Sequence, residues 1–251
     1  MENKLLNKVL PYVGWTFNIR YTSEDISILV DFCNEIETLH IQSKLNLDVR
    51  QDYALKIYNI ISFQLLSVQE SADLMSNVYV NSTHLKCILE LLDEAYLSFY
   101  RGYYTGALSV LFIALEKYLR SIYGWKPGDK NPTFLELKNC IRHLPEPESA
   151  QLAKTIVDNI YSKYDSLNPN DFYFNRHSLL HGLYRKSDFD EMNCARLFNL
   201  FSIFAKAEGI KKKTYGENME MFKIRHTIFR DCTRNKNEQM LLNINVIQGS
   251  R

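Results

Sequence analysis

Three side chains close together in the chain suit chemistry on a phosphate. Residues 175–182 read NRHSLLHG and place Arg176, His177 and His181 within six positions. An arginine keeps its proton and offers a planar fork of donors that matches phosphate oxygens. A histidine can take or give a proton near neutral pH. Together they meet the minimum need of metal-free RNA cleavage, which is a base for the 2′-OH, an acid for the 5′-oxygen and a cation for the phosphate.

These three residues do not all converge on an ideal helix. His177 and His181 would lie about 40° apart around the axis, whereas Arg176 and His181 would lie about 140° apart. One copy forms a site only if Arg176 lies in the first turn or its long stem wraps back. Otherwise two copies of the motif must meet across a dimer axis. The competing interpretation is that both histidines are ordinary core or surface residues of an aromatic-rich helix.

The composition predicts the kind of scaffold that would hold these residues. The chain has 251 residues and is 46% hydrophobic, so it suits one domain, or a domain with an extension, around a substantial core. Nine glycines and six prolines are few for this length, which favours helices over a β-rich fold. The 30 basic residues nearly balance the 29 acidic ones. Any contact with nucleic acid must therefore come from a local patch.

Several function classes have no support in the sequence. The five cysteines form no CxxC pair, so neither a zinc ribbon nor a disulfide framework is indicated. No P-loop, GxGxxG, HExxH or paired-carboxylate spacing occurs, and we expect no cofactor and no metal. The N-terminus is too polar for a signal peptide, and no apolar run reaches the roughly 18 residues that suggest a membrane span. We expect a cytoplasmic chain.

Helix-start signals divide the first half of the chain. Thr22 and the carboxylates behind it begin a helix that runs to about residue 40. A second helix is predicted from about 48 to 69, and residues 71–80 are either a short helix or a connection. Ser82 and Thr83 open a further helix over 84–100.

The helix predicted over 103–123 differs from the others. Between Ala107 and Leu115 only Ser109 is polar, and a helix that is apolar nearly all round is usually buried at the centre. Its polar residues form a thin stripe, which consists of Thr105, Ser109, Glu116 and Arg120.

The second half is punctuated by caps and prolines. Thr133 and Glu136 form a capping box for a helix to about 143, and Pro147 suits the first turn of a helix to about 164. Residues 187–190 cap a last strong helix, which Gly209 ends near 207. Residues 240–247 are compatible with a strand or a helix.

Two basic segments follow that helix. Lys211, Lys212 and Lys213 are either a solvated helix end or a phosphate-contacting patch. Further along, basic residues alternate with apolar ones, as in a basic surface helix or an RNA-contacting tail; these are Arg225, His226, Arg230 and Arg234.

The motif and the helix before it resemble the HEPN superfamily. Arg176 and His181 are separated by four residues, a polar residue follows the arginine, and a glycine follows His181. The 103–123 helix is similar to the family's glycine-led helix with an Ala, Leu, Leu-Glu pattern, which here ends in Leu115 and Glu116. The resemblance covers about residues 82–208.

This resemblance implies a fold and a division of the chain. It implies an all-α, up-and-down helical bundle, usually a symmetric dimer in which the two motifs face each other. The chain then divides into a helical N-terminal extension of unknown role (1–80), a HEPN-like bundle (81–210) and a basic C-terminal tail (211–251).

The resemblance also implies a function. Many members are metal-independent endoribonucleases of toxin–antitoxin, anti-phage or CRISPR-linked systems. Carried over, Arg176 would stabilise the scissile phosphate, His181 would act as acid and base, and His177 would orient either group. Glu116 would hold Arg176 by an ion pair. The expected partners are RNA, a second copy of the chain, and an antitoxin or defence-system protein.

Two other interpretations remain open because a fold does not settle activity. The chain could be a non-catalytic interaction or dimerisation module, or an antitoxin-like partner. It could also be a scaffold for a partner enzyme that modifies RNA or nucleotides.

Overall fold

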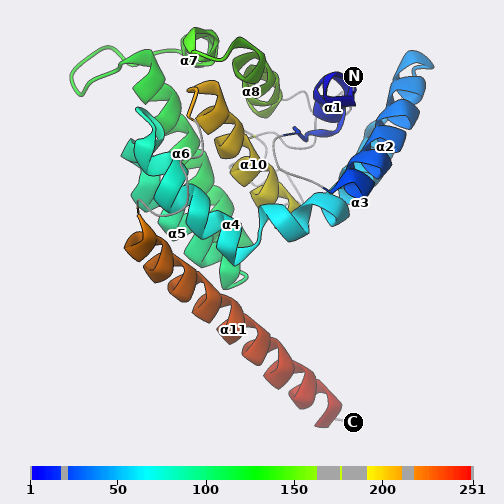
Figure 1. The fold of residues 1–251 in the computed structure, drawn as a ribbon, viewed down its shortest axis with the longest axis vertical. Coiled ribbons are helices and arrows are strands. Elements are labelled where there is room, and N and C mark those ends of the chain that lie inside the picture. Colours follow the sequence, from blue (N-terminus) through cyan, green and yellow to red (C-terminus); the bar gives the residue numbers. More distant parts are fainter. Residues whose placement is uncertain (1, 18–21, 163–175, 177–190, 211–217, 250–251) are drawn as a thin grey trace.

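The chain folds as an assembly of packed helices. The computed structural model describes residues 2–17, 22–162, 176, 191–210 and 218–249. Within these ranges the regular elements are all helical, which confirms the predicted all-α bundle with a helical N-terminal extension (Figure 1). None of the described helices is long and apolar enough to cross a membrane.

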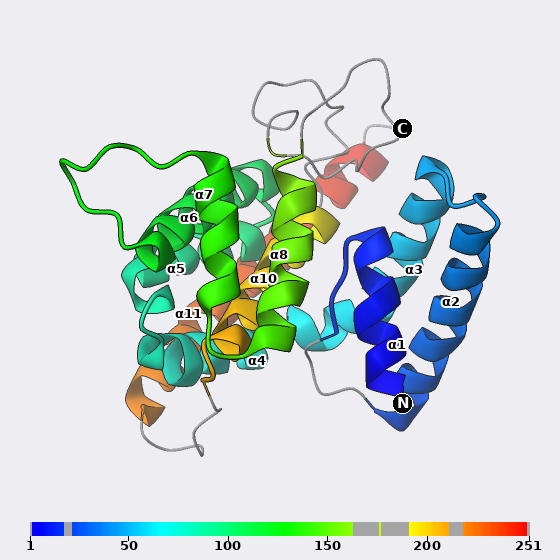
Figure 2. The same cartoon turned by 90° about the horizontal axis from the view of Figure 1, so that it is seen from above.

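The N-terminal helices enclose a small core of their own. They stand to one side of the remaining helices (Figure 2) and are α1 (Glu2–Val9), η1 (Leu10–Val13), α2 (Ser23–Ile41) and α3 (Leu47–Leu65). Their buried side chains include Leu6, Trp15, Leu29 and Ile57, and each of these is at most 1% exposed. This core also takes in Ala195 from much later in the chain.

A larger core holds the rest of the fold together. It is built by α4 (Val68–Asp73), η2 (Leu74–Val78), η3 (Tyr79–Asn81), η4 (Leu85–Ile88), α5 (Leu89–Tyr100), α6 (Tyr104–Tyr123), α7 (Phe134–Cys140), η5 (Ile141–His143), α8 (Pro147–Ile160) and α10 (Glu191–Ala207). The smaller core reaches Leu65 and the larger one begins at Ala72. Residues 68–81 therefore contribute to the core of the bundle, and α4 also contacts α3.

The most deeply buried helix is α10. Fourteen of its seventeen residues are buried, because the bundle covers one side of it and the N-terminal helices cover the other (Figures 1 and 2). The buried set includes Arg196 and Asn199, which bond to the backbone of the N-terminal unit. Each of these two polar side chains thus has a hydrogen-bond partner inside the protein, although Arg196 Nε and Asn199 Oδ1 have none among the described residues.

The expectation for α6 needs a correction. It packs against α5, α7 and α10, but it is not buried all round, since Ile113 is 58% exposed. Ile113 lies in the polar stripe of Ser109 and Glu116, and this stripe faces solvent. The central position that the apolar pattern predicted for α6 belongs to α10. The N-terminal helices α1–α3 cover α10 and leave one face of α6 open.

The starts predicted at Thr22, Thr133 and Pro147 are confirmed, and the cap predicted at 187–190 lies outside the described residues. The Asp25 amide donates to Thr22 Oγ1 at 3.1 Å and the Thr22 amide to Asp25 Oδ2 at 3.2 Å, so α2 begins with a capping box. Thr133 and Glu136 form the second box at the start of α7. Pro147 is the first residue of α8, where its missing amide proton costs no hydrogen bond.

Several helix boundaries differ from the prediction, and the helix expected to reach about 164 ends at Ile160. The helix expected over 48–69 ends at Leu65, and α4 restarts at Val68 because the Ser67 hydroxyl caps it by accepting from the Glu70 amide. Residues 74–81 form a π-helical turn and a 3₁₀ turn. The helix expected over 84–100 opens with a 3₁₀ segment, and the α-helix begins only at Leu89.

The C-terminal segment forms a long helix, α11 (Met219–Gly249), which includes the stretch compatible with strand or helix. It packs against α4, η2 and α5 and then continues past the bundle (Figure 1). Phe229 and Cys232 enter the larger core, and the Arg225 guanidinium donates twice to Asp93 at 2.9 Å. The first half of this basic segment is therefore packed onto the fold.

Candidate active site

The open face of α6 carries the carboxylate that organises the site. The neighbouring buried residues Leu115 and Leu119 anchor the helix in the core, and this leaves Glu116 on the solvent side. Its side chain is 24% exposed. A carboxylate in that position is partly shielded from water, so its ion pairs are stronger than those of a fully exposed pair.

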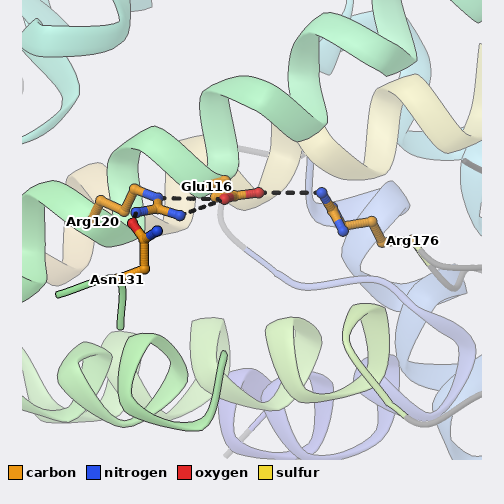
Figure 3. Close-up of polar contacts among 4 residues, drawn as sticks. All are labelled: Glu116, Arg120, Asn131 and Arg176. Atoms are coloured by element: carbon orange, nitrogen blue, oxygen red, sulfur yellow. Dashed lines mark hydrogen bonds and ion pairs between the residues drawn. The ribbon is translucent and has the colours of Figure 1, made fainter. Parts of the chain in front are cut away.

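Arg176 reaches this carboxylate from a distant part of the chain. Its Nη2 lies 3.2 Å from Glu116 Oε2, and the two residues are 60 positions apart in sequence (Figure 3). The ion pair predicted between Glu116 and Arg176 is confirmed. The helix predicted over 103–123 is therefore in contact with the arginine of the 175–182 motif.

The second oxygen of Glu116 holds another arginine. Arg120 Nη2 donates to Glu116 Oε1 at 3.0 Å, and Arg120 Nη1 donates to Asn131 Oδ1 at 3.1 Å (Figure 3). The guanidinium also lies 5.0 Å from the centre of the Trp125 ring. One carboxylate thus bridges two cations, and both cations are oriented by it.

Two aromatic rings orient the guanidinium of Arg176. Its Cζ lies 5.5 Å from the ring centre of Phe134 and 5.7 Å from that of Tyr161, and the two rings are 4.8 Å apart. Burial raises the pKa of Tyr161 above its usual range; the nearby Arg176 cation opposes that rise, and the Glu116 carboxylate adds to it. Tyr161 is therefore a neutral platform at physiological pH.

Arg176 keeps donor capacity beyond the ion pair. The Glu116 contact uses Nη2 and leaves Nη1 outside that ion pair, whereas Nε is buried and has no hydrogen-bond partner among the described residues. A guanidinium with five N–H donors and a rigid fork can bind a phosphate with the donors that remain. The arrangement presents an oriented cation at the surface of α6.

The other predicted site residues are not located. His177 and His181 lie outside the described residues, and so do Lys211, Lys212 and Lys213. Of the motif, the structure thus places only Arg176.

The basic residues of α11 have structural neighbours. Arg225 is held by Asp93 and also donates to Ser76 Oγ at 3.1 Å. His226 stacks on Phe222 at 5.7 Å, and Arg230 lies 3.7 Å from Asp231. These contacts favour the interpretation of this segment as a basic surface helix.

The aromatic platform was not predicted from the sequence. Phe134 is the first residue of α7 and Tyr161 directly follows α8, and neither belongs to a motif. Trp125 and Asn131 lie in the connection between α6 and α7 and carry no motif. The packing of α7 against both α6 and α8 brings these residues together.

The described part of the chain has no assembled metal site, and two of its buried cysteines are unreactive. No group of three or more His, Cys, Asp or Glu side chains there could hold a metal ion. Burial raises the pKa of the Cys33 and Cys140 thiols to about 12, so neither is a reactive thiolate near neutral pH.

Comparison of the chain with protein-family models, with curated proteins and with solved structures found no match.

Proposed function

We propose that this chain is a HEPN-type, metal-independent endoribonuclease that acts in a toxin–antitoxin or anti-phage setting. The observation that carries the proposal is the contact of Arg176 with Glu116 on the open face of α6. A carboxylate and two aromatic rings hold this cation in place, and the ion pair does not use all of its donors. Such a cation can stabilise the negative charge that develops on a phosphate during nucleophilic attack.

The proposed reaction is transfer of the phosphate within the RNA. The 2′-oxygen attacks phosphorus while an imidazole takes its proton, and the bond from phosphorus to the 5′-oxygen breaks. A second imidazole gives a proton to the departing 5′-oxygen. The products are a 2′,3′-cyclic phosphate and a 5′-hydroxyl. Arg176 stabilises the pentacoordinate phosphate, His181 is the acid and base, and His177 orients either group.

A dimer would supply the two imidazoles at one phosphate. In this proposal two copies of the motif meet in a composite site, and a single copy is inert. The face of α10 that the N-terminal helices cover is closed to a second copy, whereas the stripe of α6 beside Arg176 is exposed. The second copy would therefore approach from the α6 side.

Variants at the motif test this function. Cleavage of RNA in the presence of EDTA is measured for the wild type, Arg176→Ala and His181→Ala. We expect each substitution to lower the rate by about 100-fold or more. The matched control replaces Arg142 and His143, a neighbouring pair of exposed residues, with alanine and should retain the wild-type rate. Full cleavage by Arg176→Ala and His181→Ala would refute a ribonuclease site here.

One observation favours a second function. Arg176 is only 25% exposed and is already paired with Glu116, as a purely structural arginine would be. This supports the alternative of a non-catalytic HEPN-fold dimerisation module or antitoxin-like partner. It predicts a wild type that neither cleaves RNA nor is toxic in cells, and that forms a stoichiometric complex with a partner protein.

A further inference from the structure

A pocket lies on α6 beside Arg176. It has a volume of about 360 Å³, within the range of about 300–1,000 Å³ that is usual for small-molecule sites. Phe112 and Ile113 supply its apolar wall. Ile113 is a large aliphatic residue on the open face of α6, and it is 58% exposed. An aliphatic side chain left open beside a cavity can contact a bound ligand.

The charged groups of the pocket favour an anion. Lys117, Arg120 and Arg176 contribute three cations, and Glu116 contributes the single carboxylate among the described lining residues. The charge of the described lining residues therefore sums to +2 in a protein whose overall charge is only +1. A small region of positive potential attracts an anionic ligand without help from the rest of the surface.

Two of these cations are oriented before any ligand arrives. Arg120 is held by Glu116, Asn131 and the Trp125 ring, and Arg176 is held by Glu116 and its aromatic platform. Because both arginines are already ordered, binding an anion would cost little further side-chain entropy. Lys117 is exposed at the same edge of the helix.

We propose that this pocket is a nucleotide subsite, which seats one base of the RNA next to the phosphate that Arg176 holds. The base would lie against Phe112 and Ile113, and its own phosphate would contact Lys117 and Arg120. This inference rests on the proposed function, since it names the unit of the substrate beside the cleaved bond.

The lining also predicts that the subsite discriminates little between the four bases. Its one hydroxyl, on Ser109, donates to the Thr105 carbonyl at 2.9 Å, and the remaining polar groups in the described lining are charged. Contact through an apolar wall and phosphate charge tolerates every base, because each base has an apolar face. The four bases should therefore bind with similar affinity.

Nucleoside monophosphates test the subsite because they contain no bond that the enzyme can cleave. Their affinity is measured by calorimetry on the full chain, with inorganic phosphate and unphosphorylated nucleosides as comparisons. We expect the four monophosphates to bind within about tenfold of one another, and each to bind at least about tenfold tighter than phosphate or its nucleoside. Equal affinity for phosphate and for the monophosphates would overturn the subsite, because the apolar wall would then contribute nothing.

Ile113→Asp places a negative charge on the apolar wall. We expect it to weaken monophosphate binding by about tenfold or more, whereas Leu55→Asp, at a similarly exposed aliphatic residue of α3, should bind like the wild type. Lys117→Glu provides a second variant at an exposed position, with the same expected loss. Unchanged affinity in both pocket variants, with wild-type circular dichroism, would overturn the proposal.

The two proposals fail in different ways. If monophosphates bind and the pocket variants weaken them while RNA stays uncut in EDTA, the nucleotide subsite stands and the ribonuclease proposal fails. If RNA is cut, and Ile113→Asp changes neither cleavage nor monophosphate affinity, the ribonuclease stands and the subsite is overturned. A change in oligomeric state without a change in affinity would assign this face to a second copy and would also overturn the subsite.

Discussion

At the scale of single residues, the site depends on one carboxylate shared by two arginines. Glu116 contacts Arg120 at 3.0 Å and Arg176 at 3.2 Å, and all three side chains are about a quarter exposed. Each arginine also lies against an aromatic ring. Glu116 is therefore a positioning residue in this account, since it orients the cation that would meet the phosphate.

Glu116→Gln tests that role. The neutral amide keeps the shape but loses both ion pairs, so we expect the free energy of unfolding to fall by about 1 kcal/mol. RNA cleavage should fall by at least about tenfold because Arg176 is no longer held. Chemical denaturation and the cleavage assay measure the two effects.

The control for Glu116→Gln is Asp52→Asn. It breaks the more exposed ion pair of Asp52 with Lys56 and should leave both quantities within error of the wild type. Unchanged cleavage in Glu116→Gln would show that Arg176 needs no carboxylate to work.

At the scale of the elements, α10 joins the two cores. Asn199 Nδ2 donates to the Thr16 carbonyl at 3.1 Å and to Thr16 Oγ1 at 2.8 Å, and both residues are at most 3% exposed. Arg196 donates to the Val13 carbonyl at 3.2 Å and lies 5.4 Å from the Trp15 ring. Burial lowers the pKa of Arg196 to about 9, which still leaves it charged at neutral pH.

Asn199→Ala should weaken this junction. The substitution leaves the Thr16 carbonyl without that donor in a dry environment, and the expected loss is about 1–3 kcal/mol of unfolding free energy. Denaturant titration measures it. Asn59→Ala, at an exposed position of α3, is the matched control and should change the stability little. Equal stability of the two variants would contradict the junction.

Local signals in the sequence predicted much of the helical framework. The Thr22 and Thr133 capping boxes and Pro147 depend on residues within one turn, so they could be read directly. The contact of Glu116 with Arg176 could be expected only through the resemblance. The burial of Arg196 and Asn199 could not be predicted, because a polar residue on a helix is normally solvated and only the N-terminal helices cover these two.

At the scale of the whole molecule, the shared helix couples the two cores. The chain has two tryptophans, and Trp15 lies in the N-terminal core while Trp125 lies beside the bundle. In a Trp125→Phe variant, fluorescence reports only on the N-terminal unit, whereas circular dichroism reports on all helices. We expect the two denaturation curves to coincide. A separate, earlier fluorescence transition would show that the N-terminal unit unfolds alone.

The buried thiols and phenols make the fold sensitive to alkali. Burial raises the pKa of Cys33 and Cys140 from 9.0 to about 12, and burial with the Glu35 hydrogen bond raises that of Tyr53 from 10.0 to about 12. Above pH 9 the unfolded chain releases these protons first, so the unfolding free energy falls as the pH rises towards 12. Arg196 has the opposite effect, because its lowered pKa makes the unfolding free energy rise with pH above 9. It is a single group, whereas Cys33, Cys140 and Tyr53 all lower the unfolding free energy.

Denaturation at pH 8 to 11 measures this loss. Each buried thiol should contribute about 1.4 kcal/mol for each pH unit above 9. Cys33→Ala should flatten the pH dependence, and Cys87→Ser, at an exposed thiol, should leave it unchanged. A stability that is level from pH 8 to 11 would contradict the burial of these groups.

The central claim is that the Arg176 site cleaves RNA by attack of the neighbouring 2′-oxygen. The most direct measurement is the chemistry of the product ends, determined on a short RNA in EDTA and on the same RNA with one 2′-deoxy residue at the cleavage position. We expect a 2′,3′-cyclic phosphate and a 5′-hydroxyl from the first RNA, and no cleavage at the substituted position of the second. A 3′-hydroxyl end, or cleavage at the 2′-deoxy residue, would contradict it.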